Sequence, residues 1–187
     1  MTKQTAVIVG LICVATTGFP QAPSPARSST PAKKAGAAPA MKQEVHGTLI
    51  QVMRGILYPA SNVIFAAQSV NPADVKPAKD APTATDPLQS TYGQWQAVEN
   101  AGIALSESAN LLIIPGRKCS NGVPVPLQNP DWAKFVQGLR EAGMAAYKAA
   151  QSKNQDEILN ATDAVSTACS NCHDKWREKP SLAERCK

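Results

Sequence analysis

The chain has 187 residues, enough for one domain with a sizeable hydrophobic core and too few for two comfortable ones. Aromatic residues make up only 5% of it and alanine is abundant, a mixture that suits closely packed helices better than a β-sandwich. The formal net charge is +5, but all fourteen acidic residues lie after Met41, and fifteen basic residues nearly balance them there. Because the basic surplus belongs to the N-terminal segment, we expect no nucleic-acid binding.

The N-terminal segment, residues 1–19, is typical of a signal peptide. Lys3 precedes an apolar run that is too short to span a bilayer. Cys13 leaves a lipoprotein signal open, but Ile12 stands where such a signal requires a small residue. We therefore expect a periplasmic or secreted protein with no stable membrane insertion after signal cleavage. Residues 20–40 are rich in Pro, Ala and Ser and are expected to form a disordered linker.

Residues 41–187 are predicted to form one all-α domain in which four amphipathic helices each bury a single apolar stripe. The first helix is expected over about residues 41–70, with Pro59 kinking or splitting it. Its stripe comprises Val45, Leu49, Val52, Met53, Ile56 and Val63. The residues that follow, 71–90, show no periodicity and are predicted to form a long loop.

The second helix is expected over about residues 91–114, where Pro115 and Gly116 end it. The third helix is expected to begin with Asn129 as its N-cap and Pro130 as its first helical residue. The predicted core residues of these two helices are Trp95, Val98, Leu105, Ala109, Leu112, Trp132, Phe135, Leu139, Ala142, Ala146 and Ala150.

The fourth helix is expected to begin at Asn154, with Glu157 three residues on as in a capping box. It is expected to continue to the stop at Pro180. Its stripe comprises Ile158, Thr162, Val165, Cys169, Cys172 and Trp176. Four helices with one stripe each, joined by short connections near the C-terminus, predict an up-down-up-down four-helix bundle.

The motif Cys169-x-x-Cys172-His173 allows three kinds of chemistry. A thioredoxin-like dithiol requires such a pair at the start of a helix beside strands, whereas this pair lies late in a predicted helix. A zinc site requires four ligands and would need Cys119 and Cys186 to converge on the motif. Attachment of a c-type haem requires only the two thiols and the adjacent histidine. The haem interpretation therefore fits the sequence best, and the exported compartment agrees with it.

The stretch ACSNCHDKWR, Ala168 to Arg177, resembles the class II cytochromes c, which comprise cytochrome c′ and its low-spin, Met/His-ligated relatives. It is similar to the family pattern A-C-x-x-C-H-x-x-aromatic-Arg/Lys, with Trp176 at the aromatic position and Arg177 at the basic one. Leu49 to Phe65 is also similar to the first helix of the Met-ligated relatives. The resemblance covers Met41 to about Lys179 and implies a four-helix bundle with one covalently attached haem c.

The resemblance also implies the ligands of the haem iron. Cys169 and Cys172 would carry the haem, and His173 would be the proximal ligand. Met53 matches the family's methionine position and is the expected distal ligand. His46, at a similar height on the predicted first helix, is its rival, and an open distal site is the third option.

The expected function is single-electron transfer by a monohaem cytochrome, and no motif in the sequence indicates an enzyme. A five-coordinate haem that binds NO or CO is the alternative within haem chemistry. An exported metal-binding or thiol-redox helical protein is the alternative from another class. The sequence does not identify the redox partner proteins, and the resemblance implies that the chain can also form a homodimer.

Further expectations concern the remaining cysteines and the side chains around the haem, among which Trp176 is expected to contact the haem. Arg54 and Arg177 are candidates for pairing with the haem propionates. Cys119 and Cys186 are predicted to form a disulfide, because the loop and the tail that carry them emerge at the same end of an up-down-up-down bundle.

Overall fold

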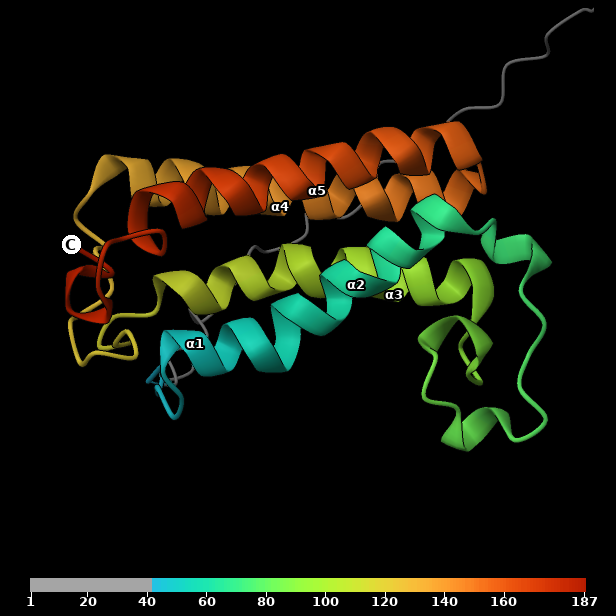
Figure 1. The fold of residues 1–187 in the computed structure, drawn as a ribbon, viewed down its shortest axis with the longest axis horizontal. Helices are drawn as coiled ribbons and strands as arrows, with labels where there is room; N and C mark the ends of the chain where they lie inside the picture. The colour runs from blue at the N-terminus through green and yellow to red at the C-terminus, as the bar shows by residue number, and fades with distance from the viewer. Residues whose placement is uncertain (1–41) are drawn as a thin grey trace, which may run out of the picture. The chain divides into compact units, whose positions relative to one another are not determined.

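Four long helical segments make up most of residues 42–187, the part of the chain that the computed structural model describes (Figure 1). Within that part, the β-structure is limited to an isolated bridge between Lys118 and Pro124. The prediction of an all-α domain is therefore confirmed. The predicted signal peptide (residues 1–19) and linker (residues 20–40) lie outside the described residues.

The first helical segment consists of α1 (Leu49–Val52), the π-helical turn η1 (Met53–Leu57) and α2 (Tyr58–Ser69). It does not begin near Met41 as predicted. Thr48 and Gln51 form a capping box in which the Gln51 side-chain oxygen accepts a hydrogen bond from the Thr48 N–H at 2.8 Å. A capping box satisfies N–H groups that have no partner within the helix, so the helix starts after Thr48.

The π-helical turn η1 is explained by Pro59, which has no N–H and whose ring displaces a carbonyl oxygen of the preceding turn. The Tyr58 N–H donates to the Met53 carbonyl oxygen, five residues back rather than four. The extra residue shifts the apolar stripe by one position, so Ile56 is 37% exposed and the prediction that it is buried is wrong. Beyond Met53, the buried apolar residues of this segment are Leu57, Ala60, Ile64 and Ala67.

The loop after α2 contains three short 3₁₀ turns, η2 (Pro72–Asp74), η3 (Ala81–Thr83) and η4 (Pro87–Gln89). It ends at Gly93, where a Cβ atom would lie 2.4 Å from the Leu88 carbonyl oxygen. This close approach requires glycine and starts α3 (Gln94–Ser108) slightly later than predicted. The 3₁₀ segment η5 (Ala109–Ile113) continues α3 and ends just before Pro115, as the sequence predicts.

The two longest helices, α4 (Pro130–Ser152) and α5 (Gln155–Trp176), begin at the predicted asparagine caps. The Asn129 side-chain oxygen accepts a hydrogen bond from the Asp131 N–H at 3.0 Å. The Asn154 side-chain oxygen accepts one from the Glu157 N–H at 3.2 Å. The Glu157 carboxylate does not complete the predicted capping box, because it accepts a hydrogen bond from the Ser152 hydroxyl at 2.7 Å instead.

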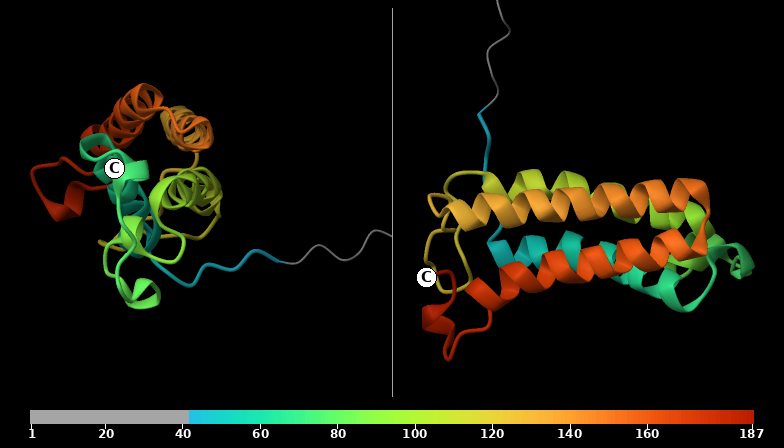
Figure 2. Two further views of the ribbon diagram at one scale, coloured as in Figure 1. Left: turned by 90° about the vertical axis from the view of Figure 1, so that its right-hand side faces the viewer. Right: turned by 90° about the horizontal axis from the view of Figure 1, so that it is seen from above.

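Each helical segment packs on two others, since α3 contacts α2 and α4 while α5 contacts α4 and α2 (Figure 2). Glycines let α3 and α4 approach closely, because a Cβ on Gly102 would lie 2.6 Å from the Tyr147 nitrogen. All the predicted core residues of α3, η5 and α4 are buried, except that Phe135 is half-buried. The segment Leu49–Ser69 has a mean hydropathy of 1.2 and by length and composition could cross a membrane, and its buried residues pack on α3 and α5.

Three segments distant in the sequence, residues 42–49, 114–131 and 174–187, meet at one end of the domain, which we call the disulfide end. The Leu49 N–H donates to the Lys118 carbonyl oxygen at 2.8 Å. The buried Arg117 guanidinium donates to the Gly47 carbonyl oxygen at 2.6 Å. Cys119 and Cys186 form a disulfide with their Cα atoms 6.6 Å apart, so the predicted pairing is confirmed.

Candidate functional site

The Cys169-x-x-Cys172-His173 motif lies in the last two turns of α5, close to the disulfide end. Both cysteines are free and half-buried, and both pack against the edge of the hydrophobic core. The His173 side chain is also half-buried. The pair therefore lies near the C-terminus of a helix, where the helix dipole disfavours a thiolate.

The pKa values of both thiols are raised, which disfavours thiol redox catalysis. Burial raises the pKa of the Cys169 thiol, an effect that the nearby Arg177 guanidinium reduces. Burial and, to a smaller extent, the neighbouring Cys169 raise the pKa of Cys172 to about 12. Thiol–disulfide exchange requires the opposite shift, because the thiolate is the nucleophile. These thiols are therefore poorly suited to a catalytic dithiol.

The environment of His173 favours its neutral form. Burial lowers the pKa of the His173 imidazole, and the charge of Arg177 acts in the same direction. Glu178 and Asp174 act against these two effects but are smaller. A neutral imidazole is the form that binds a metal, so His173 is prepared to act as a ligand at neutral pH.

A metal site made only of protein side chains is not formed near the motif. Among residues 42–187, no group of three or more His, Cys, Asp or Glu side chains is arranged to hold a metal ion. The zinc alternative would require Cys119 and Cys186, but their disulfide occupies both sulfurs. A metal bound by His173 would therefore have to arrive with most of its own ligands, as the iron of a porphyrin does.

Trp176 anchors the turn that carries the motif. Its side chain is only 4% exposed and packs edge-on against two aromatic rings of α4. The ring centroids lie 5.0 Å from Trp132 and 5.5 Å from Phe135. The Trp132 indole N–H in turn donates to the Leu112 carbonyl oxygen at 3.1 Å. The sequence predicts that Trp132 and Trp176 are buried, but it carries no signal for their pairing.

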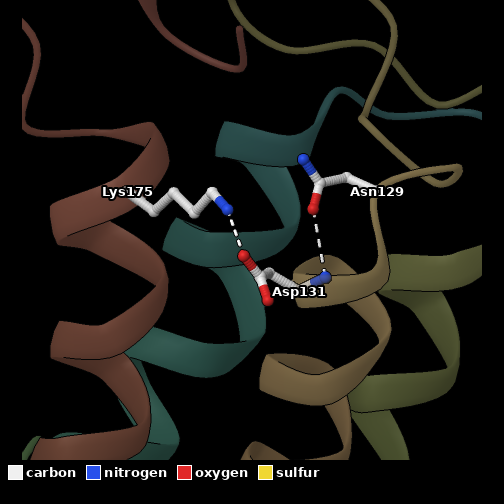
Figure 3. Close-up of polar contacts among 3 residues, drawn as sticks. All are labelled: Asn129, Asp131 and Lys175. Carbon is white, nitrogen blue, oxygen red and sulfur yellow. Dashed lines mark hydrogen bonds and ion pairs between the residues drawn. The ribbon is translucent and has the colours of Figure 1, made fainter.

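An ion pair also joins the motif turn to the start of α4. The Lys175 ammonium donates a hydrogen bond to the Asp131 carboxylate, while the Asp131 N–H is capped by Asn129 (Figure 3). The hydrogen bond from Lys175, followed by the charge of the same ammonium, lowers the pKa of Asp131. The same ammonium lies 5.3 Å from the Trp176 ring centroid. Sequence reasoning missed this pair, because its residues are 44 positions apart.

The tail after α5 folds back onto the end of that helix instead of extending it to Pro180 as predicted. The Cys186 N–H donates to the Trp176 carbonyl oxygen at 3.0 Å. The Asn121 side-chain amide donates to the carbonyl oxygens of Leu182 and Arg185 at 2.9 and 3.0 Å. Together with the disulfide, these bonds tie the tail and the end of α5 to the loop before α4.

Met53, the expected distal ligand, is half-buried at the first residue of the π-helical turn and packs against the core. At 1.5 Å per residue it lies about 6 Å from the start of its helical segment, and His173 lies about 5 Å from the end of α5. Both residues are therefore within two turns of the disulfide end.

His46 does not share a helix with Met53, so the prediction that it lies on the first helix is wrong. It precedes the capping box at Thr48, and its side chain is 84% exposed. Its imidazole lies 3.6 Å from the Glu44 carboxylate. Of the two predicted propionate partners, Arg177 is exposed and pairs with Glu178 at 2.6 Å, and Arg54 is exposed on the π-helical turn.

Comparison with protein-family models, with curated proteins and with solved structures finds no match for this chain. What the site can bind must therefore be inferred from its own residues.

These residues fit a flat apolar group that brings its own metal ligands. Leu49, Met53, Cys169 and Cys172 pack against the core at this end but are only partly covered. Figure 1 shows α1 and the last turns of α5 diverging, whereas α2 packs on α5. A group attached to Cys169 and Cys172 would cover the exposed parts of those two side chains. Two surface hollows within residues 42–187, one near Leu88 and one near Ala149, are not lined by motif residues.

Proposed function

We propose that this chain is a monohaem c-type cytochrome that carries single electrons. The observation that carries the proposal is the state of the cysteines in residues 42–187. Cys119 and Cys186 form a disulfide, whereas Cys169 and Cys172 stay free directly before His173 on one helix. Two free thiols followed by an imidazole are the attachment set of a c-type haem.

We propose an up-down-up-down four-helix bundle as the architecture that holds this haem. The packing of each helical segment on two others supports this arrangement. Only Lys153 and Asn154 separate α4 from α5, and such a short connection makes two helices antiparallel neighbours. Bundles of this kind hold cofactors with side chains from facing helices, as the resemblance to class II cytochromes c implies.

Each residue of the site has a distinct role in this proposal. Cys169 and Cys172 attach the porphyrin through thioethers, His173 provides an axial imidazole, and Met53 is the proposed second axial ligand. The bound haem supplies a one-electron iron centre whose potential thioether ligation raises. Trp176 and the pair Asp131–Lys175 hold the ligand-bearing turn in place, which favours a carrier whose geometry changes little between redox states.

The location and reaction class follow from the same proposal. A periplasmic or secreted location is proposed because c-type haem attachment and the disulfide both belong to an exported compartment. The motif residues are used for haem attachment, and we propose no catalytic role for them. The proposed partner is a redox protein. Formation of a homodimer is tested by measuring the mass of the protein in solution.

A five-coordinate haem that binds NO or CO is the second candidate function. The observation that favours it is the position of Met53 on the π-helical turn. Single π-helical turns inside α-helices are frequent at functional sites, and a rearrangement confined to this turn would withdraw the Met53 thioether from a bound iron. Electron transfer and gas binding thus differ in whether Met53 stays on the iron.

The alternatives without haem are less well supported by the site. A dithiol enzyme needs a thiolate, and burial raises the pKa of both thiols. A zinc site needs further sulfurs, which the Cys119–Cys186 disulfide withdraws.

The test is to express the full chain with the c-type maturation machinery and record visible spectra of the ferrous protein with and without CO. We expect a haem that stays with the protein in acid–acetone extraction and a sharp, split α-band that CO leaves unchanged. The variant Cys169→Ala/Cys172→Ala should be colourless, and the matched variant Cys119→Ala/Cys186→Ala should keep its haem. A colourless wild-type protein would refute the proposal, and a broad band that CO shifts would favour gas binding.

A further inference from the structure

Charged side chains are unevenly distributed along the helical domain. The part of the domain at the disulfide end comprises about two turns of each helical segment and the loops beyond them. These are residues 42–57, 108–137 and 169–187. They contain ten Lys and Arg residues and five Asp and Glu residues, a side-chain charge of +5. The other described residues, 58–107 and 138–168, contain five Lys and Arg and nine Asp and Glu, a charge of −4. The near-neutral total conceals a charge separation with its positive side at the disulfide end.

Several of the cations at this end are accessible to a partner. Lys118, Lys134 and Lys187 are exposed and Lys179 is half-buried. None of these four forms an ion pair with a carboxylate among the described residues. Arg117 differs, because it is only 5% exposed and its guanidinium is used in hydrogen bonds to backbone carbonyl oxygens. The accessible charge is therefore mostly that of lysines.

Exposed apolar side chains lie at the same end. Leu182 is 61% exposed in the turn η6 (Leu182–Glu184), between Lys179 and Lys187 in the chain. Ile113, the last residue of η5, is 44% exposed. Short-lived protein interfaces combine apolar contacts with a charged rim whose complementarity steers the encounter. The disulfide end has both components.

We propose that the disulfide end is the docking surface for an acidic protein that exchanges electrons with a haem on Cys169 and Cys172. This inference rests on the proposed function. The motif lies within two turns of this end, so a partner docked here is brought close to the redox centre. Because charges are screened over about 8 Å at physiological salt, an approaching partner responds to the local charge of this end and not to the total.

An acidic protein fits this end better than an anionic membrane or a nucleic acid. The carboxylates of Asp174, Glu178 and Glu184 lie among the cations. A uniformly negative surface would repel these carboxylates, whereas a folded partner can place its own charges to match a mixed pattern. The exposed Leu182 and Ile113 also require an apolar counterpart, which a phosphate backbone does not offer.

The first test measures how fast the ferrous protein is oxidised by small reagents of opposite charge at increasing salt. We expect the rate with anionic ferricyanide to fall as salt rises, and the rate with a cationic cobalt(III) phenanthroline complex to rise. The variant Lys118→Glu/Lys179→Glu/Lys187→Glu should slow ferricyanide several-fold and remove its salt dependence. The matched variant Lys76→Glu/Lys79→Glu/Lys148→Glu changes the net charge equally at exposed positions away from this end and should have little effect. Equal effects of the two variants would overturn the proposal.

A second readout does not depend on electron transfer. Isotope-labelled full-length protein is titrated with poly-L-glutamate, and we expect NMR shift changes near Lys118 and over residues 179–187. A haem-containing protein without these changes would overturn the docking surface and leave the proposed function standing. A colourless protein that shows them would refute the haem function and, with it, the redox role of this surface. Tighter binding to phosphatidylglycerol vesicles than to poly-L-glutamate would overturn the acidic-protein partner in favour of a membrane.

Discussion

Trp132 at the start of α4 and Trp176 at the end of α5 pack edge to face, with ring centroids 5.0 Å apart and an interplanar angle of 68°. The two side chains are 1% and 4% exposed. Because Trp176 follows His173 by one helical turn, this aromatic pair determines where the proposed haem ligand is held relative to α4.

Replacing Trp176 by Ala should strongly destabilise the domain. Removing a buried Trp side chain costs about 3–5 kcal/mol, because apolar contacts are lost and a cavity remains. Denaturant unfolding under non-reducing conditions measures the loss, and Trp176→Phe should recover part of it. The control is Tyr92→Ala, since Tyr92 is 64% exposed. Similar losses at both positions would contradict the anchoring role of Trp176.

Removing the Cys119–Cys186 disulfide should lower the free energy of unfolding by about 4 kcal/mol. The estimate follows from the chain entropy of a closed loop with a sequence separation of 67. The variant is Cys119→Ala/Cys186→Ala, and a thiol reductant should bring the wild-type protein to the same stability. Cys169→Ala/Cys172→Ala, compared in haem-free protein, is the control and should cost much less because its cysteines close no loop. Insensitivity of the wild type to reductant would count against the disulfide.

The ion pair between Lys175 and Asp131 should make stability depend on pH in the acidic range. Lys175 lowers the pKa of Asp131 below its ordinary value of 3.8, so the folded state binds a proton less readily than the unfolded state. The stabilisation is therefore fully present above pH 3.8 and is lost as the pH falls through the lower folded-state pKa. Wild type and Asp131→Asn should differ in denaturation midpoint at neutral pH and converge in acid.

Two controls separate this effect from the loss of charge alone. Asp163→Asn removes an exposed carboxylate from α5 that has no ion pair among the described residues, and it should leave the midpoint nearly unchanged. In the Lys175→Gln background, Asp131→Asn should have a smaller effect than in the wild type. A difference between wild type and Asp131→Asn that persists unchanged into acid would show that the pair is not its source.

We expect that Pro59 is the cause of the π-helical turn Met53–Leu57. Deleting Gly55 removes the extra residue while both flanking helical parts keep their buried faces. In the wild-type background this deletion places Pro59 inside a continuous α-helix, which costs about 3 kcal/mol or more. Adding Pro59→Ala to the deletion should recover most of that loss in denaturant unfolding. If the deletion lowers the free energy of unfolding equally with and without Pro59→Ala, the proline is not the cause of the turn.

In the haem-loaded protein, Met53→Ala and His46→Ala should have different effects. We expect Met53→Ala to remove the far-red absorption band of a thioether bound to ferric haem, to admit CO to the ferrous form and to lower the reduction potential. His46→Ala should change none of these, because His46 lies outside the helix and is largely exposed. The reverse pattern would make His46 the sixth ligand, and no change in either variant would indicate an open site.

The local features of this fold could be read from the sequence. Asn129 and Asn154 cap α4 and α5 because each side chain bonds to an N–H group two or three residues ahead, an interaction contained within the segment itself. The buried faces of α3 and α4 follow in the same way from their helical periodicity. The motif at Cys169–His173 belongs to this class as well, because its residues are contiguous.

The tertiary structure decided what depends on residues far apart in the chain. Packing brings Lys175 to Asp131 and Trp176 to Trp132, and neither pair has a signature in the intervening sequence. The start of the first helix is held by a distant residue as well as by its local capping box, because the Leu49 N–H donates to the Lys118 carbonyl oxygen at 2.8 Å, and His46 lies before this start. The positive disulfide end is also tertiary in origin, since it arises when three segments of modest charge meet, while the summed charge of the described residues stays near zero.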